Sequence, residues 1–239
     1  MNRFCLALLA SAFLCFMYMP AYSQNISITD NPDKALPVRL FLEANTSQAR
    51  LNNGREYIPA SPNIKGHPFF ETNTWSPGNI VYDGVAFQKL NMLYDISKDE
   101  LVILNYALPN GLSLVRQKVK EFEFLSHRFI YLAPDSLTPQ MKAGFYDVLY
   151  SGKLTVLAKR KKTVRLSSST NTDANFIADN LYYLVKDGVI FPVRSQASVM
   201  KLLRDKKGGI QQSLRKSDIV YRKDPEGAMV AMAKYYDQN

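Results

Sequence analysis

Three dipeptides that end in glycine constrain the fold most, because each predicts a tight reversal of the chain. Asp83-Gly84, Ser151-Gly152 and Asp187-Gly188 each follow a short apolar segment that contains tyrosine. Turns this tight join only strands that run antiparallel. The sequence therefore predicts an antiparallel meander, in which successive strands are neighbours in one sheet.

Short β-type segments separated by turn residues make up the middle of the chain. Val119–Phe124 alternates apolar and charged residues, as a half-buried strand does, which places Glu121 and Glu123 on the solvated face. Val38–Leu42 is expected to form a first strand. The proline density of residues 59–77 predicts an irregular segment instead of regular structure.

The last part of the chain changes to helical spacing. Ser195 is expected to cap a helix that ends at Gly208-Gly209, and Ile210–Leu214 is expected to add a short helical turn. Asp224 is expected to cap a further helix with Pro225 at its first position. The predicted fold is therefore α+β, mostly β: an antiparallel meander covered by two to three C-terminal helices, with a curved half-barrel or a sandwich as alternatives for its shape.

The first 23 residues have the layout of a secretory signal peptide. A positive start at Arg3 precedes the apolar run Phe4–Met19, and small residues lie before the expected cleavage site at Gln24. The apolar run is too short to span a membrane comfortably. A lipoprotein signal at Cys15 is the alternative, but large residues precede this cysteine. We expect an exported protein that is either periplasmic, or extracellular or outer-membrane associated.

The same features predict how the chain is divided. The expected parts are a signal peptide at 1–23, a loosely ordered arm at 24–37, a β-meander domain at 38–194 that includes the proline-rich segment 59–77, and a helical segment at 195–239 that packs on the sheet.

Composition excludes several classes of site in the mature chain. Cys5 and Cys15 lie in the leader, so thiol chemistry and thiolate metal sites are excluded after cleavage. His67 and His127 are too few for a three-histidine zinc site. We expect no cofactor and no metal.

The net charge of the mature chain predicts the kind of partner. Loss of Arg3 lowers the formal charge of +9 to about +8, which favours an anionic envelope protein, lipid or glycan as partner over nucleic acid. No transmembrane span is expected in the mature chain.

The candidate binding residues are one basic cluster and two ring-bearing side chains. Lys159, Arg160, Lys161 and Lys162 form the densest positive stretch, which can bind an anionic partner or protect an edge strand from intermolecular pairing. Trp75, the only tryptophan, and His67 lie in the proline-rich segment and are the candidates for ligand contact. No residue is assigned a catalytic role, because neither H-E-x-x-H nor G-x-S-x-G occurs.

Several ordered elements carry a resemblance to a known family. They are Gly66-His67-Pro68-Phe69-Phe70, Gly78-Asn79-Ile80-Val81-Tyr82-Asp83-Gly84, Leu93-Tyr94-Asp95-Ile96, Gly144-Phe145-Tyr146 with Leu149-Tyr150-Ser151-Gly152-Lys153, and Tyr235-Tyr236-Asp237. In this order the chain resembles an uncharacterised family of secreted envelope proteins of Bacteroidota. The resemblance implies an envelope-associated accessory protein and brings no enzymatic activity with it.

Three functions follow as hypotheses. The favoured one is a secreted, non-enzymatic accessory protein that docks on an anionic envelope partner through a basic face. The first alternative is a carrier of an amphiphile or lipoprotein, which requires an unfilled apolar cavity between Met229, Met232 and the sheet. The second is a hydrolase, which requires His67 or His127 to lie within hydrogen-bond distance of a carboxylate in a cleft.

Overall fold

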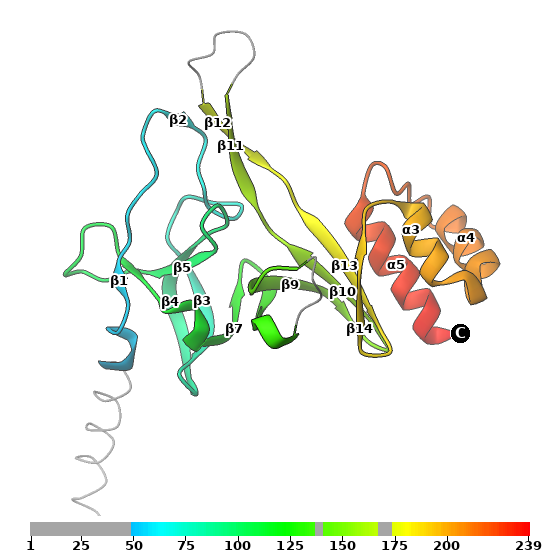
Figure 1. Cartoon of the computed structure of the whole chain (residues 1–239), viewed down its shortest axis with the longest axis horizontal. Helices are drawn as coiled ribbons and strands as arrows, with labels where there is room; N and C mark the ends of the chain where they lie inside the picture. The colour runs from blue at the N-terminus through cyan, green and yellow to red at the C-terminus, as the bar shows by residue number, and fades with distance from the viewer. Residues whose placement is uncertain (1–48, 137–140, 167–173) are drawn as a thin grey trace, which may run out of the picture. The chain divides into compact units, whose positions relative to one another are not determined.

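The computed structural model describes residues 49–136, 141–166 and 174–239. The expected signal peptide, the N-terminal arm and the strand at Val38–Leu42 lie outside these residues. The described chain is mostly antiparallel sheet followed by C-terminal helices, so the predicted α+β class is confirmed (Figure 1).

The main sheet has eleven strands, and its spatial order largely follows the sequence. In order across the sheet they are β1 (Arg55–Glu56), β6 (Leu112–Ser113), β5 (Glu100–Ile103), β4 (Val85–Asp95), β3 (Ser76–Tyr82), β7 (Val119–Phe124), β8 (His127–Leu132), β9 (Gly144–Ser151), β10 (Leu154–Lys159), β13 (Leu181–Lys186) and β14 (Val189–Val193). Short 3₁₀ turns η2 (Arg116–Lys118) and η3 (Pro134–Ser136) precede β7 and follow β8. Every pairing in this sheet is antiparallel, as a meander requires.

Two of the predicted glycine turns set the strand register directly. Asp83-Gly84 closes a hairpin in which Tyr82 pairs with Val85, and both turn residues have positive φ (50° and 80°). A type I′ turn requires this conformation at both central positions. Asp187-Gly188 repeats the geometry between β13 and β14. Ser151 ends β9 and Gly152 begins the turn to β10, which also pairs antiparallel with β9. The prediction from all three turns is confirmed.

A second, three-stranded sheet involves the proline-rich segment. Its strands are β11 (Lys162–Leu166), β12 (Ala174–Ala178) and β2 (Ile64–Lys65), in that order. β2 runs parallel to β12, with Ala174 opposite Ile64. The segment 59–77 is therefore not wholly irregular, since it supplies β2 and the first two residues of β3, including Pro77.

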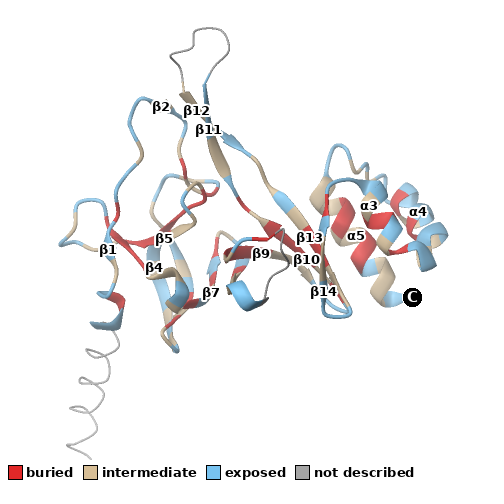
Figure 2. Cartoon of the chain, in the orientation of Figure 1, coloured by how far each residue is buried: buried red, intermediate tan, exposed pale blue. Residues whose placement is uncertain are grey.

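Figure 2 marks the buried positions along the chain, and most of them belong to two side-chain clusters. The first is rich in aromatic side chains and lies on β3 to β9, where the rings of Phe122 and Phe129 stack 4.7 Å apart. The second joins β10 and β13 to the helices, and in it Met229 and Met232 are fully buried. Val119–Phe124 behaves as predicted, because Phe122 and Phe124 are buried whereas Glu123 is exposed.

The C-terminal helices are α3 (Gln196–Leu202), the 3₁₀ turn η4 (Arg204–Lys206), α4 (Lys207–Lys216) and α5 (Pro225–Gln238). The predicted N-caps are confirmed, since the Ser195 side chain accepts from the Ser198 amide and the Asp224 side chain accepts from the Gly227 amide. The predicted stop at Gly208-Gly209 is wrong, because both glycines lie inside α4. A side chain at position 209 would collide with Tyr235 of α5, so close helix packing requires glycine there.

Candidate functional site

Three side chains of the basic cluster at 159–162 are engaged inside the fold, and one is exposed. Lys159 lies 2.7 Å from Asp99 Oδ2, and both side chains are largely buried. Arg160 is buried between two carboxylates, whereas Lys161 is exposed. Lys162 Nζ donates to backbone carbonyl oxygens at 2.6 Å and 2.9 Å in the 67–69 segment. Docking through all four charges would therefore require these internal contacts to break.

The two ring-bearing candidates, His67 and Trp75, border one small apolar cluster. Trp75 and Phe69 are both partly buried against this cluster, which includes Tyr57. The ring of His67 stacks on Phe69 with centroids 6.3 Å apart. Burial, followed by the nearby ammonium of Lys162, lowers the pKa of His67. The structure thus brings His67 and Lys162 together, and Trp75 lies on the same cluster.

A buried carboxylate, Asp147, organises the polar network of the sheet. Phe129 of β8 is the register partner of Asp147 on β9, so His127, two residues earlier on β8, lies diagonally opposite this carboxylate. His127 Nδ1 lies 2.8 Å from Asp147 Oδ2. Arg160 donates to the same oxygen from Nε at 2.8 Å and from Nη2 at 2.6 Å. Only 1% of the Asp147 side chain is exposed, so these bonds compensate for its desolvation.

The network continues from Arg160 to the first turn of α5. Arg160 Nη2 donates to Glu226 Oε2 at 2.9 Å, and Tyr182 of β13 donates to Glu226 Oε1 at 2.8 Å. Burial alone would raise the pKa of Glu226, but the hydrogen bonds from Arg160 and Tyr182 outweigh it and lower that pKa. Burial and the bond to Glu226 raise the pKa of Tyr182 to about 12. The network therefore fastens α5 to the sheet by charge-assisted bonds.

His127 is partly exposed to solvent at the other end of this network from Glu226. Its side chain is 28% exposed, and its Nε2 lies 3.5 Å from Glu71 Oε1. The hydrogen bond to Asp147 raises the pKa of His127 more than burial lowers it. His127 also lines a hollow of about 380 Å³ together with Asn79, Lys89 and residues of the β7–β8 turn. The geometric condition stated for the hydrolase hypothesis is thus met by His127, whereas no carboxylate contact of His67 is found among the described residues.

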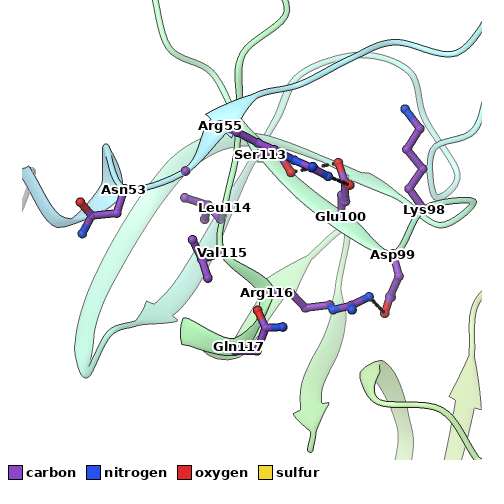
Figure 3. A pocket seen from close by; sticks show the side chains of 11 residues that line it. Asn53, Arg55, Lys98, Asp99, Glu100, Ser113, Leu114, Val115, Arg116 and Gln117 are labelled. Carbon is purple, nitrogen blue, oxygen red and sulfur yellow. Dashed lines mark hydrogen bonds and ion pairs between the residues drawn. The ribbon is translucent and has the colours of Figure 1, made fainter.

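A second hollow of about 380 Å³ lies where β1, β6 and the β4–β5 turn meet (Figure 3). Two ion pairs line it, Arg55 with Glu100 and Arg116 with Asp99. Glu100 also accepts from Ser113 at 3.0 Å. Arg55 and Arg116 therefore have carboxylate partners, whereas Lys98, which also lines the hollow, donates to the Ile58 carbonyl. Lys98 is thus the one cation of the hollow without a carboxylate partner among the described residues. Among the described residues, no group of three or more histidine, cysteine, aspartate or glutamate side chains is placed to hold a metal ion.

Positive charge without ion-pair partners gathers on the helices instead. A hollow of about 520 Å³ is lined by Lys201 of α3, Arg204 of η4 and Lys207 of α4. A neighbouring hollow of about 350 Å³ shares Gln196 and Gln211 with it and includes Arg215. All four cations are exposed, and no ion pair to any of them is found in the described part of the chain. We call Lys201, Arg204, Lys207 and Arg215 the basic helical face.

Sequence reasoning missed both Asp147 and Lys201. A signal for Asp147 exists, because it interrupts the apolar run Phe145–Tyr150, and a carboxylate within such a run is rarely buried without a partner. The identity of its partners has no local signal, since Arg160 and His127 lie 13 and 20 residues away along the chain. The positive charge at Arg204, Lys207 and Arg215 can be read from the sequence, but the gathering of these residues around adjoining hollows depends on how α3 and α4 pack.

Comparison with known proteins gives no relative on which to base a function. Neither family models, curated proteins nor solved structures matched this chain. The fold defines a class, an α+β protein in which a long antiparallel meander carries helices with a basic outer face. Among the described helices, none combines the length and the apolar character needed to cross a membrane.

Proposed function

We propose that this chain is an exported, non-enzymatic accessory protein that docks on an anionic partner of the cell envelope through the basic helical face. The observation that carries the proposal is the grouping of Lys201, Arg204 and Lys207 around one hollow without an ion-pair partner among the described residues. Unbalanced charge of one sign attracts partners of the opposite sign and speeds their encounter. The proposed export rests on the leader sequence.

Anionic binding is tested with a charge-reversal variant. Lys201→Glu/Arg204→Glu/Lys207→Glu should weaken binding of a fluorescein-labelled heparin fragment, used as a generic polyanion, by at least about tenfold at physiological salt. Raising the salt should weaken wild-type binding, because salt screens exposed charges. Fluorescence anisotropy measures both effects.

The matched control changes the same total charge elsewhere. Lys120→Glu/Lys142→Glu/Lys161→Glu replaces three exposed lysines outside the helices and includes the exposed member of the 159–162 cluster. It should retain most of the wild-type affinity. Equal losses in both triple variants would show a response to net charge alone, and the basic helical face would then be the wrong assignment.

Export is tested on protein recovered from its host. The signal peptide predicts that intact mass spectrometry finds a chain that starts at Gln24. Recovery from the soluble cytoplasmic fraction of a chain that still begins at Met1 would contradict the proposed location while leaving the basic helical face as a binding site.

A second candidate function is general acid–base catalysis at His127. A histidine whose Nδ1 lies 2.8 Å from a buried carboxylate and whose ring borders a hollow is arranged as general bases often are. A panel of ester, glycoside and peptide substrates tests this candidate, with His127→Gln as the comparison. Hydrolysis by the wild type that this variant loses would support catalysis, and no hydrolysis of any substrate would count against it.

The carrier hypothesis gains no supporting observation. Met229 and Met232, which were expected to border an unfilled cavity, are fully buried in one cluster with side chains of β10, β13 and the other helices.

A further inference from the structure

The connection between α4 and α5 carries a symmetrical charge pattern around one exposed apolar residue. Two basic pairs, Arg215-Lys216 and Arg222-Lys223, flank the segment 217–221. All four basic side chains are exposed, and no ion pair to them is found among the described residues. Between the two pairs, Val220 is 46% exposed. We call residues 215–223 the α4–α5 connection.

Packing fixes which side chains of the connection point outward. Ile219 and Tyr221 are partly buried against the helical cluster, so Val220 between them is turned toward solvent. The backbone is held in place as well, since the Ile219 amide donates to the Leu214 carbonyl and the Lys223 amide donates to the Val220 carbonyl. The exposed valine is therefore presented by an anchored turn, not by a loose end.

The connection is continuous with the basic helical face. Arg215, Ile219 and Val220 line the smaller of the two adjoining hollows on the helices. Asp218 is the only acidic residue between the two basic pairs, so positive charge is in clear excess. Cations that surround an exposed apolar side chain suit the surface of an anionic lipid bilayer. The anionic headgroups attract the cations, and the interface beneath the headgroups accepts the apolar side chain.

We propose that the α4–α5 connection docks this protein on the surface of an anionic lipid bilayer, with Val220 inserted among the headgroups. The proposal rests on the proposed function and names its partner. An acidic protein would satisfy the charges equally well, but it gives no reason for an apolar side chain held outward at their centre. The excess of positive charge and the outward position of Val220 therefore both favour lipid as the partner.

Insertion is measured with tryptophan reporters in the full chain. Val220→Trp should show a blue-shifted emission with vesicles containing about one third anionic phospholipid, and no shift with purely zwitterionic vesicles. Val189→Trp is the matched control, because Val189 on β14 is 51% exposed in the native chain and lies outside the connection. Trp75 is common to both variants, so the difference between their spectra reports position 220. The control should show no shift.

Affinity for the same vesicles is measured by co-sedimentation. Lys216→Gln/Arg222→Gln/Lys223→Gln removes three charges and should weaken binding about 100-fold. The same variant should lose much less affinity for the heparin fragment, which is proposed to bind at Lys201, Arg204 and Lys207.

The outcomes separate this proposal from the function on which it rests. Heparin binding without vesicle binding would overturn the lipid assignment and leave an acidic protein or glycan as the partner. Vesicle binding with equal spectra for Val220→Trp and Val189→Trp would overturn the docking role of the connection. If the wild type bound neither vesicles nor heparin, the proposed function itself would be overturned.

Discussion

Asp147 shows how much of the interior depends on a single carboxylate. One of its oxygens receives hydrogen bonds from His127 and from two nitrogen atoms of Arg160, and Arg160 in turn binds Glu226. A buried ion pair adds little net stability compared with apolar residues of equal shape, but removal of one partner leaves the other charge desolvated. Even a conservative substitution of Asp147 should therefore lower the free energy of unfolding strongly.

Asp147→Asn tests this dependence without a change of volume. The amide leaves Arg160 with Glu226 as its only carboxylate partner among the described residues, so the free energy of unfolding should fall by about 3–5 kcal/mol. Urea denaturation followed by circular dichroism measures the change. The control is Asp187→Asn, at an exposed turn position where asparagine also tolerates positive φ. A loss for Asp147→Asn no larger than that of the control would show that the network is dispensable.

His127 makes the stability of the protein depend on pH in a defined direction. The bond to Asp147 raises the pKa of His127 above its usual value of about 6.5. The folded state therefore holds the imidazole proton more tightly than the unfolded state does. The stabilisation from His127 is complete below about pH 6.5 and is lost as the pH rises through the folded-state pKa.

His127→Gln should remove this pH-dependent contribution to the free energy of unfolding. The unfolding midpoint in urea, measured at intervals from pH 5 to 9, should fall across the neutral range in the wild type more steeply than in the variant. Parallel wild-type and variant curves would mean that the proton on His127 is not linked to folding.

At the scale of elements, the two ends of α5 are both fastened to the sheet by side chains. Glu226 binds Arg160 near the first turn, and Asp237 near the last turn caps the β9–β10 turn. Asp237 Oδ2 accepts from the Lys153 amide at 2.8 Å and from Tyr150 Oη at 3.0 Å, whereas Oδ1 accepts from the Leu154 amide at 3.1 Å. One carboxylate thus joins a helix end to a hairpin.

Asp237→Ala should loosen that hairpin selectively. Loss of its hydrogen bonds should lower the free energy of unfolding by about 1–3 kcal/mol and speed amide exchange at Lys153 and Leu154. Hydrogen exchange read by NMR locates the effect, with the Asp187-Gly188 turn as the internal control. Unchanged exchange at Lys153 and Leu154 would contradict the capping role.

Elements were predictable wherever the signal was local. The hairpin turns, the alternation of Val119–Phe124 and the caps at Ser195 and Asp224 each act within a few residues, and the structure has all of them. Gly208-Gly209 was misassigned because its reason is distant, namely the ring of Tyr235 on another helix. The roles of the charges at 159–162 were hidden for the same reason, since their partners lie in the β4–β5 turn, in the 67–69 segment, on β9 and on α5.

At the scale of the whole molecule, the sheet is continuous from β1 to β14, although the main apolar clusters lie on different strands. Sequence periodicity predicted the meander but not this division, because which side chains meet depends on register and on the packing of the helices. The charge network around Asp147 and Glu226 joins β8, β9 and β10 to α5. A substitution that destabilises the helices should therefore also destabilise the strands at the opposite end of the sheet.

Met232→Ala tests that cooperativity. Met232 is fully buried among the helices, so its truncation should cost about 2–5 kcal/mol. Trp75 packs near β4 and β5, separated from the helical cluster by several strands, and reports on the opposite part of the sheet. Because the hydrogen-bonded sheet is unbroken, tryptophan fluorescence and circular dichroism at the helical band should shift to the same lower urea midpoint. A shifted helical signal beside an unchanged fluorescence midpoint would instead show that the helices unfold separately from the meander.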